Sequence, residues 1–142
     1  MQVACCITTL MLCGATAFAR IGETKAQIEK RYGQATGGSG SSKAYAYEDF
    51  FVIVTFDNGI SGIETFQKLN DSPMARLEIE ELLEANSDGS KWKRSARNDF
   101  PIFYTAKTRF AEYNAITNTL TIADDAAVRR INVRNRSVEA EP

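Results

Sequence analysis

The alternation of apolar and polar positions is clearest between residues 45 and 67. A run rich in aromatic and β-branched residues ends at Phe56, the tripeptide Asp-Asn-Gly follows, and a second apolar run begins at Ile60. Aromatic and β-branched residues favour strands, and an Asn-Gly pair between two such runs favours a tight turn. This stretch is therefore predicted to form a β-hairpin on which the rest of the chain packs.

The first strand of this hairpin has two different faces. Alternation places Phe50, Val52, Val54 and Phe56 together on a wholly apolar face, which is predicted to be the core side. The other face is mixed, so it is either covered by a helix or neighbouring chain, or exposed as an aromatic surface that binds a partner. This candidate binding face carries four large side chains: Tyr45, Tyr47, Phe51 and Ile53.

The second strand of the hairpin departs from strict alternation. Ile60, Ile63 and Phe66 are spaced by three residues rather than by two. An extra residue in one strand restores the pairing of the apolar positions, and glycine accommodates it well. A β-bulge is therefore predicted near Gly62.

Two helices flank the hairpin. Thr24 followed three residues later by Gln27 is typical of a capping box, and the pattern predicts a short helix from Lys25 that ends at Gly33. After the hairpin, Ser72 as N-cap and Pro73 at the first helical position predict a second helix over residues 74–86. Its four glutamates are interpreted as a solvated face: Glu78, Glu80, Glu81 and Glu84.

The second half of the chain contains three short strand patterns, at residues 102–105, 109–113 and 119–123. A short helix is predicted from Asp124 to Ile131, and residues 132–142 are expected to form a frayed polar tail. The order predicts an α+β fold, an antiparallel sheet with two short helices packed on one face. We expect a single domain over residues 20–131, with tandem helix-plus-sheet units at 21–67 and 72–123.

Trp92 is the only tryptophan of the chain. It is interpreted either as a core residue at the start of a strand or as an anchor in a partner surface, where tryptophan is enriched. Its basic neighbours are interpreted as a solvated edge: Lys91, Lys93, Arg94 and Arg97.

Composition and charge limit the classes of function. The chain has 142 residues, 44% hydrophobic and 25% charged, with a formal net charge of -1 and no histidine. Such a balance does not favour nucleic acid or anionic lipid. The absence of histidine removes the triads that depend on it and most zinc sites. No catalytic residue, metal site or cofactor is predicted, and carboxylate-based catalysis remains the enzyme alternative.

Residues 1–19 contain no charged side chain and hold all three cysteines. Ala17-Phe18-Ala19 before Arg20 has the small-x-small pattern of a signal-peptidase site, so this segment is predicted to be a signal peptide cleaved after Ala19. An uncleaved membrane anchor and a lipoprotein signal are the alternatives. Cleavage leaves a mature chain without cysteine, which needs no disulfide to fold.

Two motifs carry a family resemblance. Residues 21–33 (Ile-Gly-Glu-Thr through Tyr-Gly) and residues 54–59 (Val-Thr-Phe-Asp-Asn-Gly) resemble small exported bacterial proteins of the BamE/SmpA type. The broader likeness is to the β-lactamase-inhibitor-protein fold, which is built from tandem helix-plus-antiparallel-sheet units. The resemblance covers residues 21–66 and implies a non-catalytic envelope protein that acts through protein contacts. It assigns no binding residue.

The sequence thus predicts an exported protein–protein interaction module of the bacterial cell envelope, periplasmic or envelope-associated. The alternatives are a membrane-anchored structural envelope protein and a small carboxylate-based enzyme. We expect a protein partner rather than nucleic acid, and membrane contact only through an uncleaved N-terminal segment. The sequence indicates neither the partner nor the oligomeric state.

Overall fold

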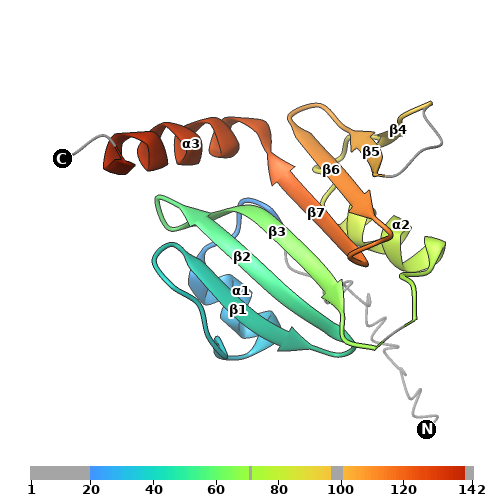
Figure 1. The fold of residues 1–142 in the computed structure, drawn as a ribbon, viewed down its shortest axis with the longest axis horizontal. Helices are drawn as coiled ribbons and strands as arrows, with labels where there is room; N and C mark the ends of the chain where they lie inside the picture. Colours follow the sequence, from blue (N-terminus) through green and yellow to red (C-terminus); the bar gives the residue numbers. More distant parts are fainter. Residues whose placement is uncertain (1–19, 71, 97–100, 140–142) are drawn as a thin grey trace, which may run out of the picture.

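The computed structural model describes residues 20–70, 72–96 and 101–139, and within them the chain has an α+β fold. Figure 1 shows three helices and seven strands in this part of the chain. In chain order they are α1 (Lys25–Tyr32), β1 (Ser42–Tyr47), β2 (Phe50–Asp57), β3 (Ile60–Lys68), α2 (Arg76–Ala85), β4 (Lys93–Arg94), β5 (Ile102–Thr105), β6 (Arg109–Asn114), β7 (Thr119–Asp124) and α3 (Asp125–Glu139).

All seven strands belong to one antiparallel sheet, in the spatial order β1-β2-β3-β7-β6-β5-β4. Two meanders, β1–β3 and β4–β7, are joined where β3 pairs with β7 from Ile63↔Ala123 to Gln67↔Thr119. The element order is therefore a helix followed by a meander, twice. The antiparallel sheet predicted from the sequence is confirmed.

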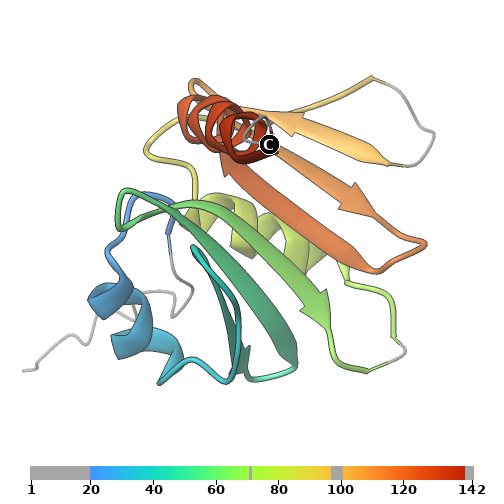
Figure 2. The same cartoon turned by 60° about the vertical axis from the view of Figure 1, so that its left-hand side comes forward.

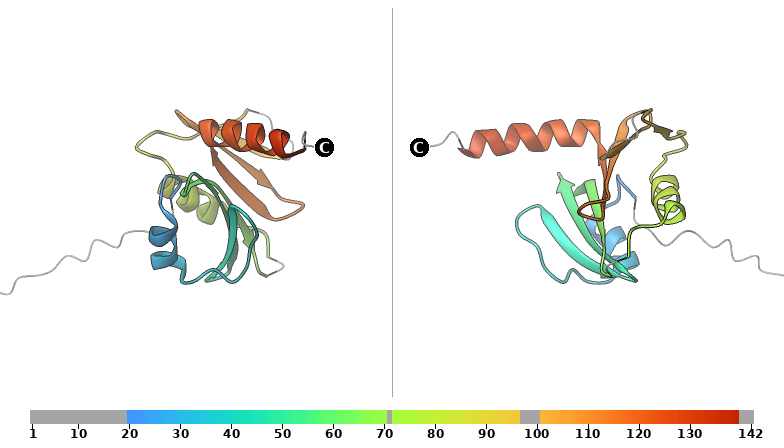
Figure 3. Two further views of the ribbon diagram at one scale, coloured as in Figure 1. Left: turned by 90° about the vertical axis from the view of Figure 1, so that its left-hand side faces the viewer. Right: turned by 45° about the vertical axis from the view of Figure 1, so that its right-hand side comes forward.

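Helices α1 and α2 lie on the same face of the sheet, as Figures 2 and 3 show. Each helix contributes a buried apolar stripe, Ile28 and Tyr32 from α1 and Ile79, Leu82 and Leu83 from α2. These side chains share one hydrophobic cluster with inward-facing residues of both meanders. The strand residues at its centre are Tyr45, Val52, Val54, Phe66, Leu120 and Ile122.

The start of α1 confirms the predicted capping box. The backbone N–H of Thr24 donates to Oε1 of Gln27 (2.8 Å), and the backbone N–H of Gln27 donates to Oγ1 of Thr24 (3.4 Å). The helix ends at Gly33, whose φ of 83° lies in the region that favours glycine.

Helix α2 begins two residues later than predicted, at Arg76 instead of Met74, and Ser72 is not its N-cap. The reason lies in the β6–β7 turn, because Asn118 accepts from the backbone N–H of Met74 (2.8 Å) and donates to the carbonyl of Ser72 (2.7 Å). These two bonds engage the backbone before the helix. Glu78 accepts from the backbone N–H of Ala75 instead, at 2.6 Å.

The faces predicted for residues 45–56 are wrong on one point. The chain turns at Glu48 (φ 50°), so residues 42–47 form the separate strand β1, which pairs with β2 through Tyr47↔Phe50 and Tyr45↔Val52. Residues paired across two strands share a face. Both tyrosines therefore lie on the core side, opposite to the face of Phe51 and Ile53.

The predicted bulge at Gly62 is confirmed. The register passes from Thr55↔Ile63 to Phe56↔Ser61 and leaves Gly62 as the extra residue of β3. An added Cβ at Gly62 would lie 2.6 Å from Cβ of Ala127 in α3. Glycine is needed here because the helix approaches the strand backbone too closely for any side chain.

Helix α3 follows directly on β7, packs at the end of the sheet near the β2–β3 turn and then runs beyond it (Figures 1 and 3). Buried Asp57 anchors this helix by accepting from Arg130 and Arg134, each at 2.5 Å. The hydrogen bond from Arg130 is the largest of the effects that leave the pKa of Asp57 below its usual value. The helix extends to Glu139, so the tail predicted to fray from residue 132 is helical as far as that residue.

The predicted signal peptide, residues 1–19, lies outside the described residues. Within those described, no helix has the length and apolar character needed to cross a membrane.

The contact between Gly62 and Ala127 generates a stability prediction. Gly62→Ala forces α3 away from the bulge, and we expect this overpacking to lower the free energy of unfolding by roughly 1–3 kcal/mol. The measurement is urea denaturation followed by circular dichroism.

A double-mutant cycle tests the cause. Ala127→Gly alone is expected to cost about 1 kcal/mol through helix propensity. Ala127→Gly removes the methyl group that clashes with the new Cβ at residue 62. The double variant should therefore lose less free energy of unfolding than the two single variants lose together. Strict additivity would contradict the clash.

Candidate binding groove

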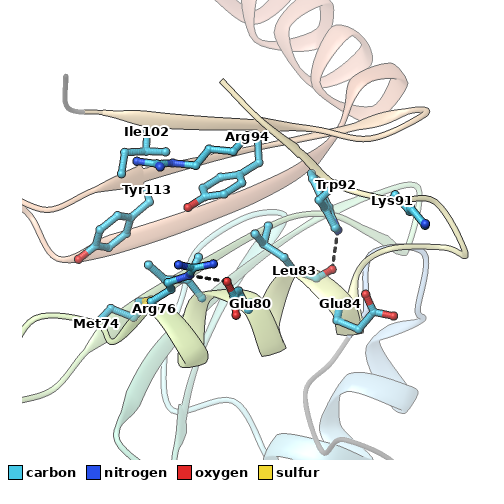
Figure 4. A pocket seen from close by; sticks show the side chains of 12 residues that line it. Met74, Arg76, Glu80, Leu83, Glu84, Lys91, Trp92, Arg94, Ile102 and Tyr113 are labelled. Carbon is cyan, nitrogen blue, oxygen red and sulfur yellow. Dashed lines mark hydrogen bonds and ion pairs between the residues drawn. The ribbon is translucent and has the colours of Figure 1, made fainter. Parts of the chain in front are cut away.

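A groove of about 700 Å³ lies between α2 and the strands β4–β6. Figure 4 shows side chains from both walls converging on it. Volumes of a few hundred to a thousand Å³ are typical of small-molecule sites. Its apolar lining consists of Met74, Ile79 and Leu83 from the helix side and Ile102, Tyr104 and Tyr113 from the strand side, and Trp92 closes one end.

Strand alternation and register bring the strand-side residues together. Ile102 and Tyr104 are two apart in β5 and therefore share a face, while Phe103 points to the opposite face. Tyr113 of β6 pairs directly with Ile102, which places the two side chains next to each other. The wall is partly open, because Ile102, Tyr104 and Trp92 pack on the core but are only partly buried.

Trp92 fixes the position of one end of the groove relative to α2. Its indole Nε1 donates to the carbonyl of Leu83 at 2.6 Å. This carbonyl also accepts from the backbone N–H of the C-cap residue Asn86, at 3.0 Å. The bond from Trp92 ties the segment that leads into β4 to the C-terminal turn of α2. With its polar atom engaged, the indole ring presents an apolar surface to the groove.

Charged side chains form the rim. Arg76 and Glu80, both exposed, make an ion pair across one turn of α2 at 2.7 Å. Lys91 and Arg94 on the strand side and Glu84 on the helix side are also exposed, and none of the three forms an ion pair within the described residues. The result is an aromatic and aliphatic floor with a charged rim, an arrangement suited to a segment that carries both kinds of group.

The electrostatic environment of Tyr104 reflects this arrangement. Burial raises the pKa of its hydroxyl, the positive charge of Arg94 opposes the rise and the negative charge of Glu80 adds to it. The phenol therefore stays neutral at physiological pH.

The structure does not bring the five predicted site residues together. Tyr45 is fully buried and Tyr47 is half-buried, and both contact helix α1. The ring of Tyr32 in α1 stands 5.8 Å from the ring of Tyr45 and 4.9 Å from that of Tyr47. The prediction of one exposed face containing both tyrosines is therefore wrong, because the turn at Glu48 places them on the core side.

Phe51 and Ile53 do lie on the face away from α1 and α2, with Phe51 half-buried and Ile53 37% exposed. The row of paired residues across this face runs from Ile53 through Thr65, Thr121 and Glu112 to Phe103. Three polar side chains thus separate Ile53 from Phe103. This face carries scattered apolar residues instead of one continuous patch.

Trp92 is the one predicted site residue that lines the groove. Tyr104, Tyr113 and Arg94 were not identified from the sequence as site residues. The alternation of Ile102 and Tyr104 predicted a strand with a shared face, but nothing local indicates that α2 stands opposite that face.

Glu64 is a buried carboxyl on the core face of β3, where it pairs with Val54 and Ile122. Its side chain has no exposure and neither oxygen has a hydrogen-bond partner within the described residues. Burial raises its pKa to about 8 and Glu23 adds to the rise, while Arg109 and Arg31 oppose it. Glu64 lines neither the groove nor the polar hollow at the C-terminal end of α2.

Within the residues that the structure describes, no group of three or more Cys, Asp or Glu side chains has the arrangement of a metal site. Comparison of the chain with protein-family models, curated proteins and solved structures finds no significant match.

The state of Glu64 generates a prediction about pH. Its pKa is about 8 in the folded chain against 4.5 in the unfolded one, so the folded state binds the extra proton between these values. The free energy of unfolding should therefore fall as pH rises through this window, by roughly 3–5 kcal/mol in total. Glu64→Gln, which is neutral throughout, should remove this decline and be the more stable protein at pH 9.

Urea denaturation of both proteins at pH 5, 7 and 9 measures the difference. Glu112→Gln, on the opposite face, is the matched control and should retain the wild-type pH dependence. An identical pH profile for wild type and Glu64→Gln would contradict a protonated, buried Glu64.

The bond between Trp92 and Leu83 generates a second prediction. Trp92→Phe keeps an aromatic ring but removes the side-chain donor to the carbonyl of Leu83 and leaves only the backbone N–H of Asn86, which should cost about 1 kcal/mol of stability. Trp92→Ala also removes the packing and should cost more. Circular dichroism is the appropriate probe because both variants lack tryptophan, and wild-type stability of Trp92→Phe would argue against the bond.

Proposed function

We propose that this protein is a non-catalytic protein-interaction module of the bacterial cell envelope, and that the groove between α2 and β4–β6 is its binding surface. The observation that carries the proposal is the combination of partly exposed aromatic side chains, Trp92 and Tyr104, with a charged rim that includes Arg94. Tryptophan, tyrosine and arginine are the residues most enriched at the energetic centres of protein interfaces.

The state of the titratable groups favours binding over acid–base chemistry. The carboxyl with the strongly raised pKa, Glu64, is enclosed in the core away from the groove. At the groove itself Glu80 is held by Arg76. A general acid or base must reach its substrate within hydrogen-bond distance, and enclosure of Glu64 prevents this.

The envelope location and the family relationship belong to the same proposal. Residues 1–19 supply the uncharged segment and the small-x-small pattern of an export signal. The succession of helix and meander, repeated once along the chain, is consistent with a tandem architecture of the BamE/SmpA or β-lactamase-inhibitor-protein type. In this proposal the export route delivers a folded interaction module that lacks cysteine.

Site-specific photo-crosslinking tests the proposal. The full-length chain is produced in its source organism with a photoreactive phenylalanine analogue at Glu84, an exposed position on the groove rim. We expect irradiation to yield an adduct of one defined mass in the envelope fraction.

The matched control places the same analogue at Gln67, an exposed position on the opposite face of the sheet. An adduct from Glu84 alone would support the groove as the binding surface. Equal adducts from both positions would assign the contact elsewhere, and no adduct from either position would contradict an interaction module.

A further inference from the structure

We propose that the groove receives an extended protein segment in which acidic side chains flank a bulky apolar one. This inference rests on the proposed function and names the partner's chemistry. It is carried by the placement, beside the apolar floor, of two cations that form no ion pair among the described residues, and by the dimensions of the groove.

The charge of the groove differs in sign from that of the whole protein. Its lining holds three cations (Arg76, Lys91 and Arg94) and two carboxylates (Glu80 and Glu84), a formal net charge of +1 against -1 for the chain. Arg76 is already paired with Glu80, whereas Lys91 and Arg94 form no ion pair with any of the residues that the structure describes, so these two are the cations proposed to meet a partner. An acidic segment complements these two.

Arg94 is placed to combine the two kinds of contact. It extends from β4 along the strand wall, which also carries Ile102 and Tyr113, as Figure 4 shows. A guanidinium binds a carboxylate through two parallel N–H···O bonds, which fixes the direction of the carboxylate. A carboxylate held at Arg94 brings the neighbouring side chain of the same segment onto the apolar floor.

The groove has two distinct ends. Met74 and Arg76 lie at one end, and Trp92 with Lys91 at the other (Figure 4). Helix α2 has 10 residues and is therefore about 15 Å long. An extended chain advances about 3.3 Å per residue, so roughly five residues span this length. The carboxylate of Glu84 lies on the rim and is not neutralised by an ion pair among the described residues, so it repels a negatively charged ligand. It therefore disfavours a polyphosphate backbone, which carries a negative charge at every step.

Trp92 provides the readout, since it is the only tryptophan and forms one end of the groove. The probes are three hexapeptides with blocked termini and the same Phe and Leu residues, which differ only in carrying two Asp, two Asn or two Lys. We expect the Asp peptide to change Trp92 emission in a saturable way, with an affinity at least tenfold higher than that of the Asn peptide. This affinity should fall as the salt concentration is raised. The Lys peptide should show no binding.

Arg94→Gln should weaken the Asp peptide at least tenfold, whereas Lys107→Gln, which removes an exposed cation in the β5–β6 turn, should leave its affinity unchanged. Circular dichroism should show that both variants are folded.

A further Asn peptide with a free C-terminus tests whether the groove recognises a terminal carboxylate instead of a side-chain carboxylate. Tighter binding of that peptide than of the Asp peptide would overturn the inference. Tighter binding of oligothymidine would also overturn it.

The outcome is independent of the photo-crosslinking result. An adduct from Glu84 together with equal binding of the Asp and Asn peptides, or with no peptide binding, would keep the interaction module and refute the acidic partner. Absence of both adduct and peptide binding would refute the two proposals together.

Discussion

The pairing of β3 with β7 is the interaction on which the rest of the structure depends. Five residue pairs, from Ile63↔Ala123 to Gln67↔Thr119, join two meanders that are separate in the sequence. Each meander with its helix is a short stretch of chain, and a unit of that size buries a smaller fraction of its surface than the joined domain does. Once the two are joined, Phe66 lies beside Leu120, and α1 and α2 cover a single core.

The unequal packing of the two helices follows from this shared sheet. The stripe of α1 packs on β1, where the ring of Tyr32 contacts those of Tyr45 and Tyr47. Opposite β4–β6, α2 is attached at its two ends, by Asn118 before its first turn and by Trp92 at its last. The space left between these attachments is the groove. The groove thus arises from how the helix is held, and the residues that hold the helix also shape the groove.

Two polar features set limits on the stability of this arrangement. Asp57 sits buried on the face away from the two packed helices and is matched by Arg130 and Arg134, which fixes α3 across the end of the sheet. Glu64 is buried on the core face without a hydrogen-bond partner in the described structure, and burial favours its neutral form by raising its pKa to about 8. The ion-paired carboxylate of Asp57 thus positions α3, whereas the buried carboxyl of Glu64 makes the stability of the core depend on pH.

The sequence by itself determined the elements whose signals are local. The capping box of Thr24 and Gln27, the Asn-Gly turn, the bulge at Gly62 and the strands β5, β6 and β7 depend on neighbours a few residues away, and they were predicted correctly. The α+β class and the antiparallel sheet followed from their order. Only the tertiary structure decided which face Tyr45 and Tyr47 occupy, because the turn at Glu48 carries no glycine or proline to reveal it. It also decided the start of α2 and the existence of the groove, since these depend on Asn118 and Trp92, whose partners are set by how the whole sheet assembles.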